Sequence, residues 1–173
     1  MFEIIRRLWR HRWLDERDTR RAIDPALVER LTRRVRASEQ RHGGEVRLYV
    51  EAALPTSYLL RAGSLREIVR QRALAMFSKL RVWDTEDNNG VLIYLLLAER
   101  AIELVADRGL NRHVSPEQWQ AMVQRMRSSF GPGDFEAGLT QALEEVSALL
   151  VQHYPVTPDH PRANQLPDRP DLR

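Results

Sequence analysis

The chain has 173 residues. A domain of that size buries about 70% of the surface that its unfolded form exposes, so neither a metal nor a disulfide is required for stability. The absence of cysteine excludes disulfide bridges, thiolate nucleophiles and sulfur-ligated metals, and the near balance of 27 basic against 24 acidic residues, a formal charge of +3, does not favour nucleic-acid binding.

Residues 1–21 form a predicted basic extension, with an amphipathic helix over residues 2–13. That helix could pack on its own domain, contact a protein partner or lie on an anionic membrane. Charged residues interrupt every apolar run of this segment, so it lacks the hydrophobic region of a secretory signal. The longest apolar run, 91–98, is shorter than the roughly 20 residues that span a bilayer. We therefore expect a soluble, cytoplasmic protein without a transmembrane segment.

The next elements alternate between helix and strand. Asp24 before Pro25 predicts a helix start, and apolar spacing continues that helix to about residue 41. Alternation over 45–54 predicts a strand, and a capping box of Ser64 and Glu67 starts a second helix. The apolar run from Gly90 to Leu97 predicts a central strand covered on both faces. Since a helix connects these two strands, we expect them to be parallel.

A hairpin follows the central strand. A reversal at Glu99 and Arg100 would pair Ala98 with Ala101 and therefore Leu92 with Asp107. Two more helices are predicted after Ser115 and after the glycine–proline break at 131–133, which brings the domain to residue 154. Beyond it, five prolines in residues 155–173 predict a disordered tail.

The hairpin geometry places a set of oxygen-bearing side chains at one edge of the sheet. The turn before the central strand would meet the end of the second hairpin strand, where Arg108 also lies. Carboxylate and amide oxygens are the ligands that calcium and magnesium prefer, so a divalent-cation site is predicted there. Alternatively, these residues only build a loop and cap a strand. The proposed ligands are Asp84, Glu86, Asp87, Asn88, Asn89 and Asp107.

Other site patterns do not occur in the sequence. The acidic turn is not an EF-hand, because placing Gly90 at the loop glycine puts Leu96 at the twelfth position. There is no nucleophile elbow, zinc-protease motif or glycine-rich phosphate loop. The five histidines have no metal-ligand spacing.

Three segments of the chain resemble one known family. The run TEDNNGVLIYLLLAERAIELVADRG, then SPEQW, then FGPGDFEAGLTQALEEV are similar to the TPM domain of thylakoid-lumen acid phosphatase and photosystem II repair proteins, over residues 22–154. The resemblance implies a three-layer α/β/α sandwich with a small mixed sheet of three to four strands, in agreement with the predicted order of elements. It also implies divalent-cation binding, often of calcium, and in the plant representative an acid phosphatase activity on phosphate monoesters.

The sequence departs from the family pattern at two places. Many relatives have Asp-Asn-Gly before the strand, whereas this chain has Asn88-Asn89-Gly90, with Asp87 beside it as the substitute charge. The glycine-rich segment after the hairpin is replaced by residues 106–109. Most relatives also carry an export signal and a membrane anchor, so the chain resembles a short, cytosolic bacterial subgroup.

Two functions are therefore predicted. The first is a non-enzymatic module that binds a divalent cation, calcium or magnesium, or a protein partner. The alternative is a metal-assisted phosphatase for which Asp87, Asp107 and Arg108 are the candidate catalytic residues, with a cation and an arginine stabilising the developing charge. The weakness of the alternative is that no serine, cysteine or histidine is placed as nucleophile.

Overall fold

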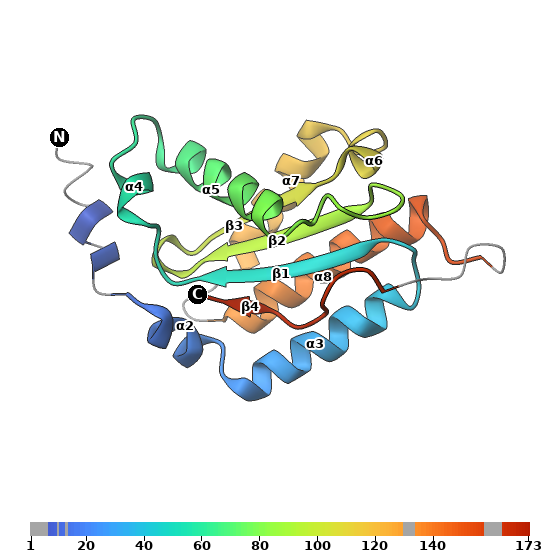
Figure 1. The fold of residues 1–173 in the computed structure, drawn as a ribbon, viewed down its shortest axis with the longest axis horizontal. Coiled ribbons are helices and arrows are strands. Elements are labelled where there is room, and N and C mark those ends of the chain that lie inside the picture. Colours follow the sequence, from blue (N-terminus) through green and yellow to red (C-terminus); the bar gives the residue numbers. More distant parts are fainter. Residues whose placement is uncertain (1–6, 10, 13, 130–133, 158–163) are drawn as a thin grey trace.

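The computed structural model describes residues 7–9, 11–12, 14–129, 134–157 and 164–173 (Figure 1). Helices and strands alternate as far as a central hairpin, and helices follow it. The elements are α2 (Glu16–Ala22), α3 (Pro25–Glu39), β1 (Glu45–Glu51), α4 (Thr56–Leu59), α5 (Leu65–Lys79), β2 (Gly90–Leu96), the 3-10 helix η1 (Leu97–Glu99), β3 (Ala101–Ala106), α6 (Arg108–Asn111), α7 (Pro116–Ser129), α8 (Phe135–His153) and β4 (Asp171–Leu172).

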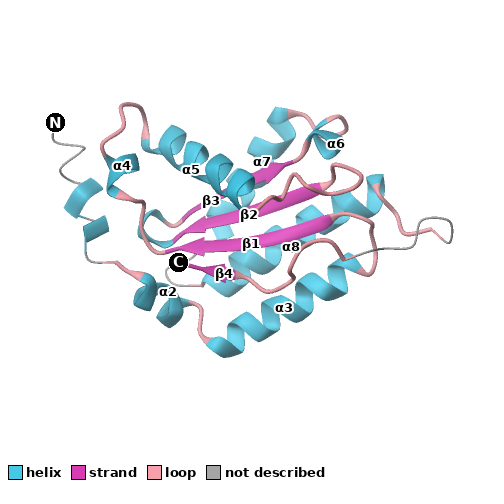
Figure 2. Cartoon of the chain, viewed as in Figure 1, coloured by secondary structure: helices cyan, strands magenta, loops and turns pink. Residues whose placement is uncertain are grey.

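One mixed sheet lies at the centre of the molecule, with strand order β3-β2-β1-β4. Strand β1 is parallel to β2 and to β4, whereas β3 is antiparallel to β2. Helix α5 covers one face, and α3, α7 and α8 cover the other (Figure 2). The predicted three-layer α/β/α sandwich with a small mixed sheet is confirmed. In the described part of the chain, no helix is both long enough and apolar enough to span a membrane.

Burial on both faces explains the unbroken apolar run of β2. All seven of its residues are buried. Val91, Ile93 and Leu95 join a core with α3, α7 and α8, while alternate residues between them join a second core under α5. A strand between two helical layers has no wet face, so its sequence does not alternate between apolar and polar residues.

Strand β1 is also buried along its whole length, although charged residues alternate with apolar ones at both of its ends. The carboxylate of Glu51 accepts two hydrogen bonds from Arg72 of α5, with Nε to Oε2 at 2.9 Å and Nη2 to Oε1 at 2.5 Å. The Tyr94 hydroxyl donates to the same carboxylate at 2.8 Å. Burial, followed by the Glu51 charge, raises the pKa of Tyr94 well above its ordinary value. The Glu51 carboxylate is therefore satisfied by neighbouring elements rather than by water.

Three predicted helix starts are confirmed. Asp24 accepts from the Leu27 amide at 2.7 Å, with Pro25 as the first helical residue of α3. Ser64 and Glu67 form the reciprocal capping box that begins α5. Helix α7 begins after Ser115, whose hydroxyl accepts from the amide three residues later. Caps are local interactions, which is why the sequence pattern identifies them.

The hairpin register differs from the prediction by two residues. Leu92 pairs with Val105 instead of Asp107, and Leu96 instead of Ala98 pairs with Ala101. The connection is the four-residue loop 97–100 rather than a tight reversal, because η1 turns the chain and Arg100 takes a left-handed conformation with φ 48°. A shift of two residues preserves which side chains face each core.

The predicted disorder of the tail is corrected for residues 164–173, which lie along β1. Asp171 pairs with Tyr49, and Leu172 pairs with Val50. The amino-acid composition did not predict that this segment is ordered, because its order comes from contacts with distant residues. One of these contacts is the ion pair of Arg47 with Asp171 at 2.5 Å. Residues 158–163 of the predicted tail lie outside the described residues.

Part of the N-terminal segment also contacts the domain. Arg7 donates to the Gly63 carbonyl at 3.0 Å, and His11 accepts from the Leu54 amide through Nδ1 at 3.0 Å. The opposite ring nitrogen then carries the proton and donates to Glu99 at 3.0 Å. Trp9 points to solvent with 66% of its surface exposed. Residues 1–6, 10 and 13 of the predicted amphipathic helix lie outside the described residues.

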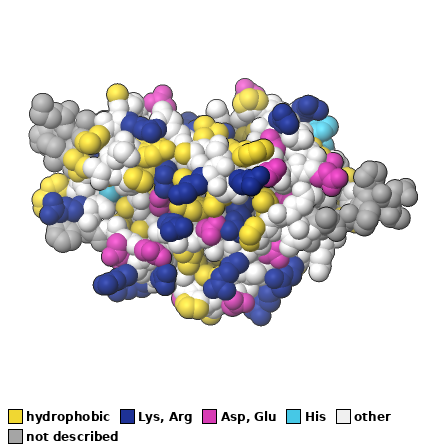
Figure 3. Space-filling model, in the orientation of Figure 1, with side chains coloured by type: hydrophobic (Ala, Val, Ile, Leu, Met, Phe, Trp, Pro, Cys, Tyr) yellow, Lys and Arg dark blue, Asp and Glu magenta, His cyan; other side chains and the backbone are white. Residues whose placement is uncertain are grey.

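Charges of both signs are interspersed on the face drawn in Figure 3, with apolar side chains between them. This is the pattern expected from the near balance of basic and acidic residues in the sequence.

Candidate functional site

The turn that precedes β2 and the residues that follow β3 meet at one end of the sheet. The Asp107 amide donates to the Gly90 carbonyl at 2.9 Å, and the Gly109 amide donates to the Asn88 carbonyl at 2.9 Å. Asn88 has a left-handed backbone with φ 54°, a conformation that asparagine tolerates better than most residues. The two segments therefore lie next to each other, as the direction of the hairpin predicted.

Backbone oxygens crowd against Gly109. A Cβ atom at this position would lie 2.4 Å from the Asn88 carbonyl oxygen, and 2.7 Å from both the Asp87 carbonyl oxygen and the Tyr154 hydroxyl. Only glycine permits so close an approach of another backbone. Two adjacent carbonyl oxygens of the turn and the hydroxyl of Tyr154 thus lie close to Gly109.

Asp107 is the most unusual residue of this cluster. It is only 8% exposed. Its Oδ1 accepts from the Arg108 amide at 2.6 Å, which caps the short helix α6. Its Oδ2 is buried and has no hydrogen-bond partner within the described part of the protein. A buried carboxylate oxygen without a partner is costly, because water has been removed and nothing replaces it.

Arg108 and Asp87 frame the same cluster from the solvent side. The Arg108 Nε donates to the Asn88 Oδ1 at 2.8 Å, which links the two segments through their side chains. Asp87 is exposed, and its carbonyl faces Gly109. We refer to Asp87, Asn88, Asp107, Arg108 and Gly109 as the rim cluster.

The other predicted ligands have different roles. Asp84 is paired with Arg81 at 2.5 Å. Asn89 is buried, and its side-chain amide donates to the Gly43 carbonyl at 3.1 Å. Glu86 is exposed, and its amide donates to the Gln165 side chain at 2.8 Å. Among the residues that the structure describes, no three histidine, aspartate or glutamate side chains form a group that could hold a metal ion. The six predicted ligands therefore do not form a single carboxylate cage.

Tyr154 joins the rim cluster from the far end of the domain and was not predicted. Burial raises the pKa of its hydroxyl, and the charges of Asp87 and Asp107 raise it further, against the opposing effect of Arg112. The sequence offered no signal for this role, because Tyr154 simply follows the last apolar stripe. Its position beside Gly109 depends on where α8 ends in space.

Two of the five histidines also come together near Tyr154. The rings of His113 and His153 stack with centroids 4.6 Å apart, and His113 meets the Tyr154 ring edge-on at 6.3 Å. These two histidines are 40 positions apart in the sequence, so their spacing predicted no pair.

The sequence profile of the TPM domain matches residues 17–149, which is most of the chain. The protein therefore belongs to the TPM domain family.

Several solved structures are similar to this chain, among them the following two. One is the BA42 protein from the psychrophilic bacterium Bizionia argentinensis, with a TM-score of 0.68 and 24% identity over 83% of this chain and 90% of that one. The other is the N-terminal domain of a protein from P. gingivalis, with a TM-score of 0.55 and 19% identity over 75% of this chain and 78% of that one. At these identities the likeness shows the fold alone. No curated protein matches the chain.

Proposed function

We propose that this TPM domain is a divalent-cation-binding module whose site is the rim cluster. The observation that carries the proposal is the buried Oδ2 of Asp107, which has no hydrogen-bond partner in the described part of the chain. A cation beside this atom would supply the missing partner and remove the cost of burying an uncompensated charge.

The surrounding atoms fit a hard cation. The carbonyl oxygens of Asp87 and Asn88 approach Gly109, which is two residues after Asp107. Asp87 adds a second carboxylate at the exposed side. Carbonyl and carboxylate oxygens are the usual ligands of calcium, and water completes such a shell when protein ligands are few. With two carboxylates and no closed cage, we expect a weak site that favours calcium over magnesium, because magnesium demands stricter geometry.

Calorimetric titration with calcium chloride and with magnesium chloride tests this proposal. The informative variant is Asp107→Asn, since asparagine keeps the shape and still caps the Arg108 amide but loses the charge. We expect this variant to lose measurable calcium binding and Asp87→Asn to weaken it. Asp84→Asn is the matched control, because Asp84 is paired with Arg81 and should leave the affinity unchanged.

Thermal unfolding provides an independent measurement. A ligand that binds only the folded state at 100 times its dissociation constant stabilises it by about 2.7 kcal/mol. Calcium should therefore raise the melting temperature of the wild type and of Asp84→Asn but not that of Asp107→Asn. Equal calcium affinity in the wild type and Asp107→Asn would refute the assignment of the site.

A phosphomonoesterase is the second candidate, and the position of Arg108 is the observation that favours it. Asn88 holds this guanidinium at the rim, where it could stabilise a phosphate beside a bound cation. The rim cluster itself contains no serine, cysteine or histidine, which leaves Asp87 or a cation-bound water as the attacking group. Turnover of an aryl phosphate that requires calcium and disappears in both Asp107→Asn and Arg108→Gln would select the enzyme over the binding module.

A further inference from the structure

Residues 164–173 lie between α3 and the outer edge of β1, and we call the surface that they cover the groove (Figure 1). We call these ten residues the C-terminal segment. Its main-chain pairing is short: among the described residues, Asp171 and Leu172 are the only two of the segment that pair with β1 as a strand. Arg173 adds two bonds, from its amide to the Val50 carbonyl at 2.9 Å and from the Ala52 amide to its own carbonyl at 2.8 Å.

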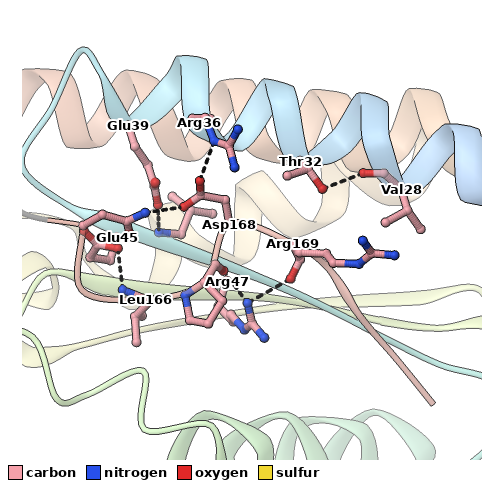
Figure 4. A network of polar contacts seen from close by, with 12 residues as sticks. Val28, Thr32, Arg36, Glu39, Glu45, Arg47, Leu166, Asp168 and Arg169 are labelled. Carbon is pink, nitrogen blue, oxygen red and sulfur yellow. Dashed lines mark hydrogen bonds and ion pairs between the residues drawn. The ribbon is translucent and has the colours of Figure 1, made fainter.

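Side chains of the groove recognise the C-terminal segment by charge. On α3, Arg36 pairs with Asp168 at 2.9 Å. On β1, Arg47 pairs with Asp171 at 2.5 Å and donates to the Pro167 carbonyl. It also donates to the Arg169 carbonyl at 2.9 Å (Figure 4). The groove therefore presents arginines to both aspartates of the segment. The opposite arrangement also occurs, because Glu29 of α3 pairs with Arg169 of the segment at 3.5 Å. Burial opposes ionisation of Asp168, but its bonds to Arg36 and Asn164 hold its pKa below the ordinary value, so the docked carboxylate is charged.

An apolar anchor accompanies the charges. The Leu166 side chain is 9% exposed and joins the core under α5. Its amide donates to the Glu45 carboxylate at 3.0 Å. Strand addition at a sheet edge, an anchoring leucine and specific charge pairs are together the features by which domains bind extended peptides.

The groove and its occupant belong to different parts of the chain. Helix α3 and β1 lie inside the region that matches the TPM domain, which ends at residue 149, whereas the C-terminal segment lies outside it. The segment is joined to α8 through residues 154–163. Apart from the bond between Asn164 and Asp168, the contacts described above join the segment to the domain, so they would be the same if the segment came from another molecule.

We propose that this groove is a peptide-binding site that accepts residues 164–173 of a second copy of the chain, so that two copies pair by reciprocal exchange of the C-terminal segment. Within one molecule, the covalent connection to α8 keeps the segment near the groove at an effective concentration on the order of millimolar. The segment of the same molecule therefore competes strongly with the segment of a second copy. Exchange therefore becomes dominant at high protein concentration, or wherever docking within one molecule is weakened.

Charge reversal across the Arg36–Asp168 pair tests the proposal. In an Arg36→Asp chain, and likewise in an Asp168→Arg chain, like charges come together when the segment binds in the groove of its own molecule. When the two chains are mixed, exchange restores an opposite-charge pair in both grooves. We expect each variant alone to be monomeric by size-exclusion chromatography with light scattering, and the equimolar mixture to reach twice that mass. The doubly substituted chain, Arg36→Asp with Asp168→Arg, is the matched control and should behave as the wild type. A mixture that stays at monomer mass at every concentration would overturn the proposal.

Binding of a synthetic peptide is a second test, which still applies if a charge-reversal variant is unstable. A fluorescent synthetic peptide of residues 164–173 is titrated into a full-length chain with Asp168→Arg and Asp171→Arg, which weaken its own segment and leave the groove intact. We expect saturable anisotropy, with an affinity at least tenfold tighter than for the wild type, whose groove is already filled. A peptide with the same two substitutions should not bind. If the variant chain keeps a native circular-dichroism spectrum without binding the peptide, or unfolds and is not restored by it, the segment is an integral strand and exchange is excluded.

Discussion

Removing Arg72 should destabilise the protein more than most single substitutions, because Arg72 neutralises a buried carboxylate. The Glu51 side chain is 7% exposed and that of Arg72 is 14% exposed, and they share two hydrogen bonds. Arg72→Met keeps the length of the side chain but leaves the Glu51 charge without its cation. Loss of one partner from a buried pair costs about 3–5 kcal/mol. For a domain of this size, that corresponds to a fall in melting temperature of about 6–20 °C.

Replacing the whole network should cost much less than removing one member. Glu51→Leu combined with Arg72→Met removes both charges, but it leaves the Tyr94 hydroxyl buried without its acceptor, at about 1–3 kcal/mol. Adding Tyr94→Phe removes that hydroxyl. The triple variant should then be close to wild type, because replacing a buried pair with apolar groups of similar volume is often neutral.

Urea unfolding followed by tryptophan fluorescence measures all three variants, since the chain has four tryptophans. The expected order of stability is wild type and triple variant, then the double variant, then Arg72→Met. If Arg72→Met costs less than about 1 kcal/mol, the value typical of an exposed pair, the buried charge is not what holds β1 against α5. A triple variant as unstable as Arg72→Met would refute the argument in the same way.

Three further predictions concern single positions. Burial raises the pKa of Glu103, so the stability that its protonated form contributes is present at acid pH and is lost as pH rises through the folded pKa. Glu103→Gln should therefore gain stability relative to wild type as pH rises above the ordinary glutamate pKa, and urea titrations that show this difference falling with pH would contradict the prediction. Gly109→Ala would place a methyl group 2.4 Å from the Asn88 carbonyl oxygen and should lower the free energy of unfolding by about 1–3 kcal/mol in thermal unfolding. Gly43→Ala is the control, because the nearest atom to its methyl group would lie 3.8 Å away, and its effect should stay within about 0.5 kcal/mol. Equal effects of the two substitutions would contradict the close packing around Gly109. Ser64→Ala should cost about 1 kcal/mol and Ser64→Asp almost nothing, and an Ala variant as stable as wild type would show that the capping box is dispensable.

Local chemistry made three strands of the sheet, β1, β2 and β3, and most helix starts predictable. The capping box at Ser64 and the Asp24–Pro25 start are complete within a few residues, so no distant contact is needed to recognise them. The register of the hairpin was harder to predict from the sequence. Its loop contains Arg100 in a left-handed conformation that arginine rarely adopts, and no turn rule based on glycine or asparagine predicts that conformation.

Long-range contacts account for what the sequence could not show. Glu51 alternates with apolar residues as an exposed strand residue would, and only the fold reveals that Arg72 covers it. The C-terminal segment has the composition of a disordered tail, yet Arg36 and Arg47 hold it. At the rim, the meeting of Asp107 with the acidic turn followed from the direction of the hairpin. The approach of Tyr154 depends on the end of a helix that is far away in sequence.

The position of the fourth strand has a consequence for synthesis of the chain on the ribosome. The Thr19 hydroxyl donates to the Arg173 carbonyl across a separation of 154 residues. The nascent polypeptide can assemble β1, β2 and β3 early, but the outer edge of β1 stays unpaired until residues 164–173 have been translated. Nascent chains can aggregate by pairing through such unpaired strand edges. Translation speed and chaperone access in that interval should therefore govern how much of this protein is recovered in folded form from cells.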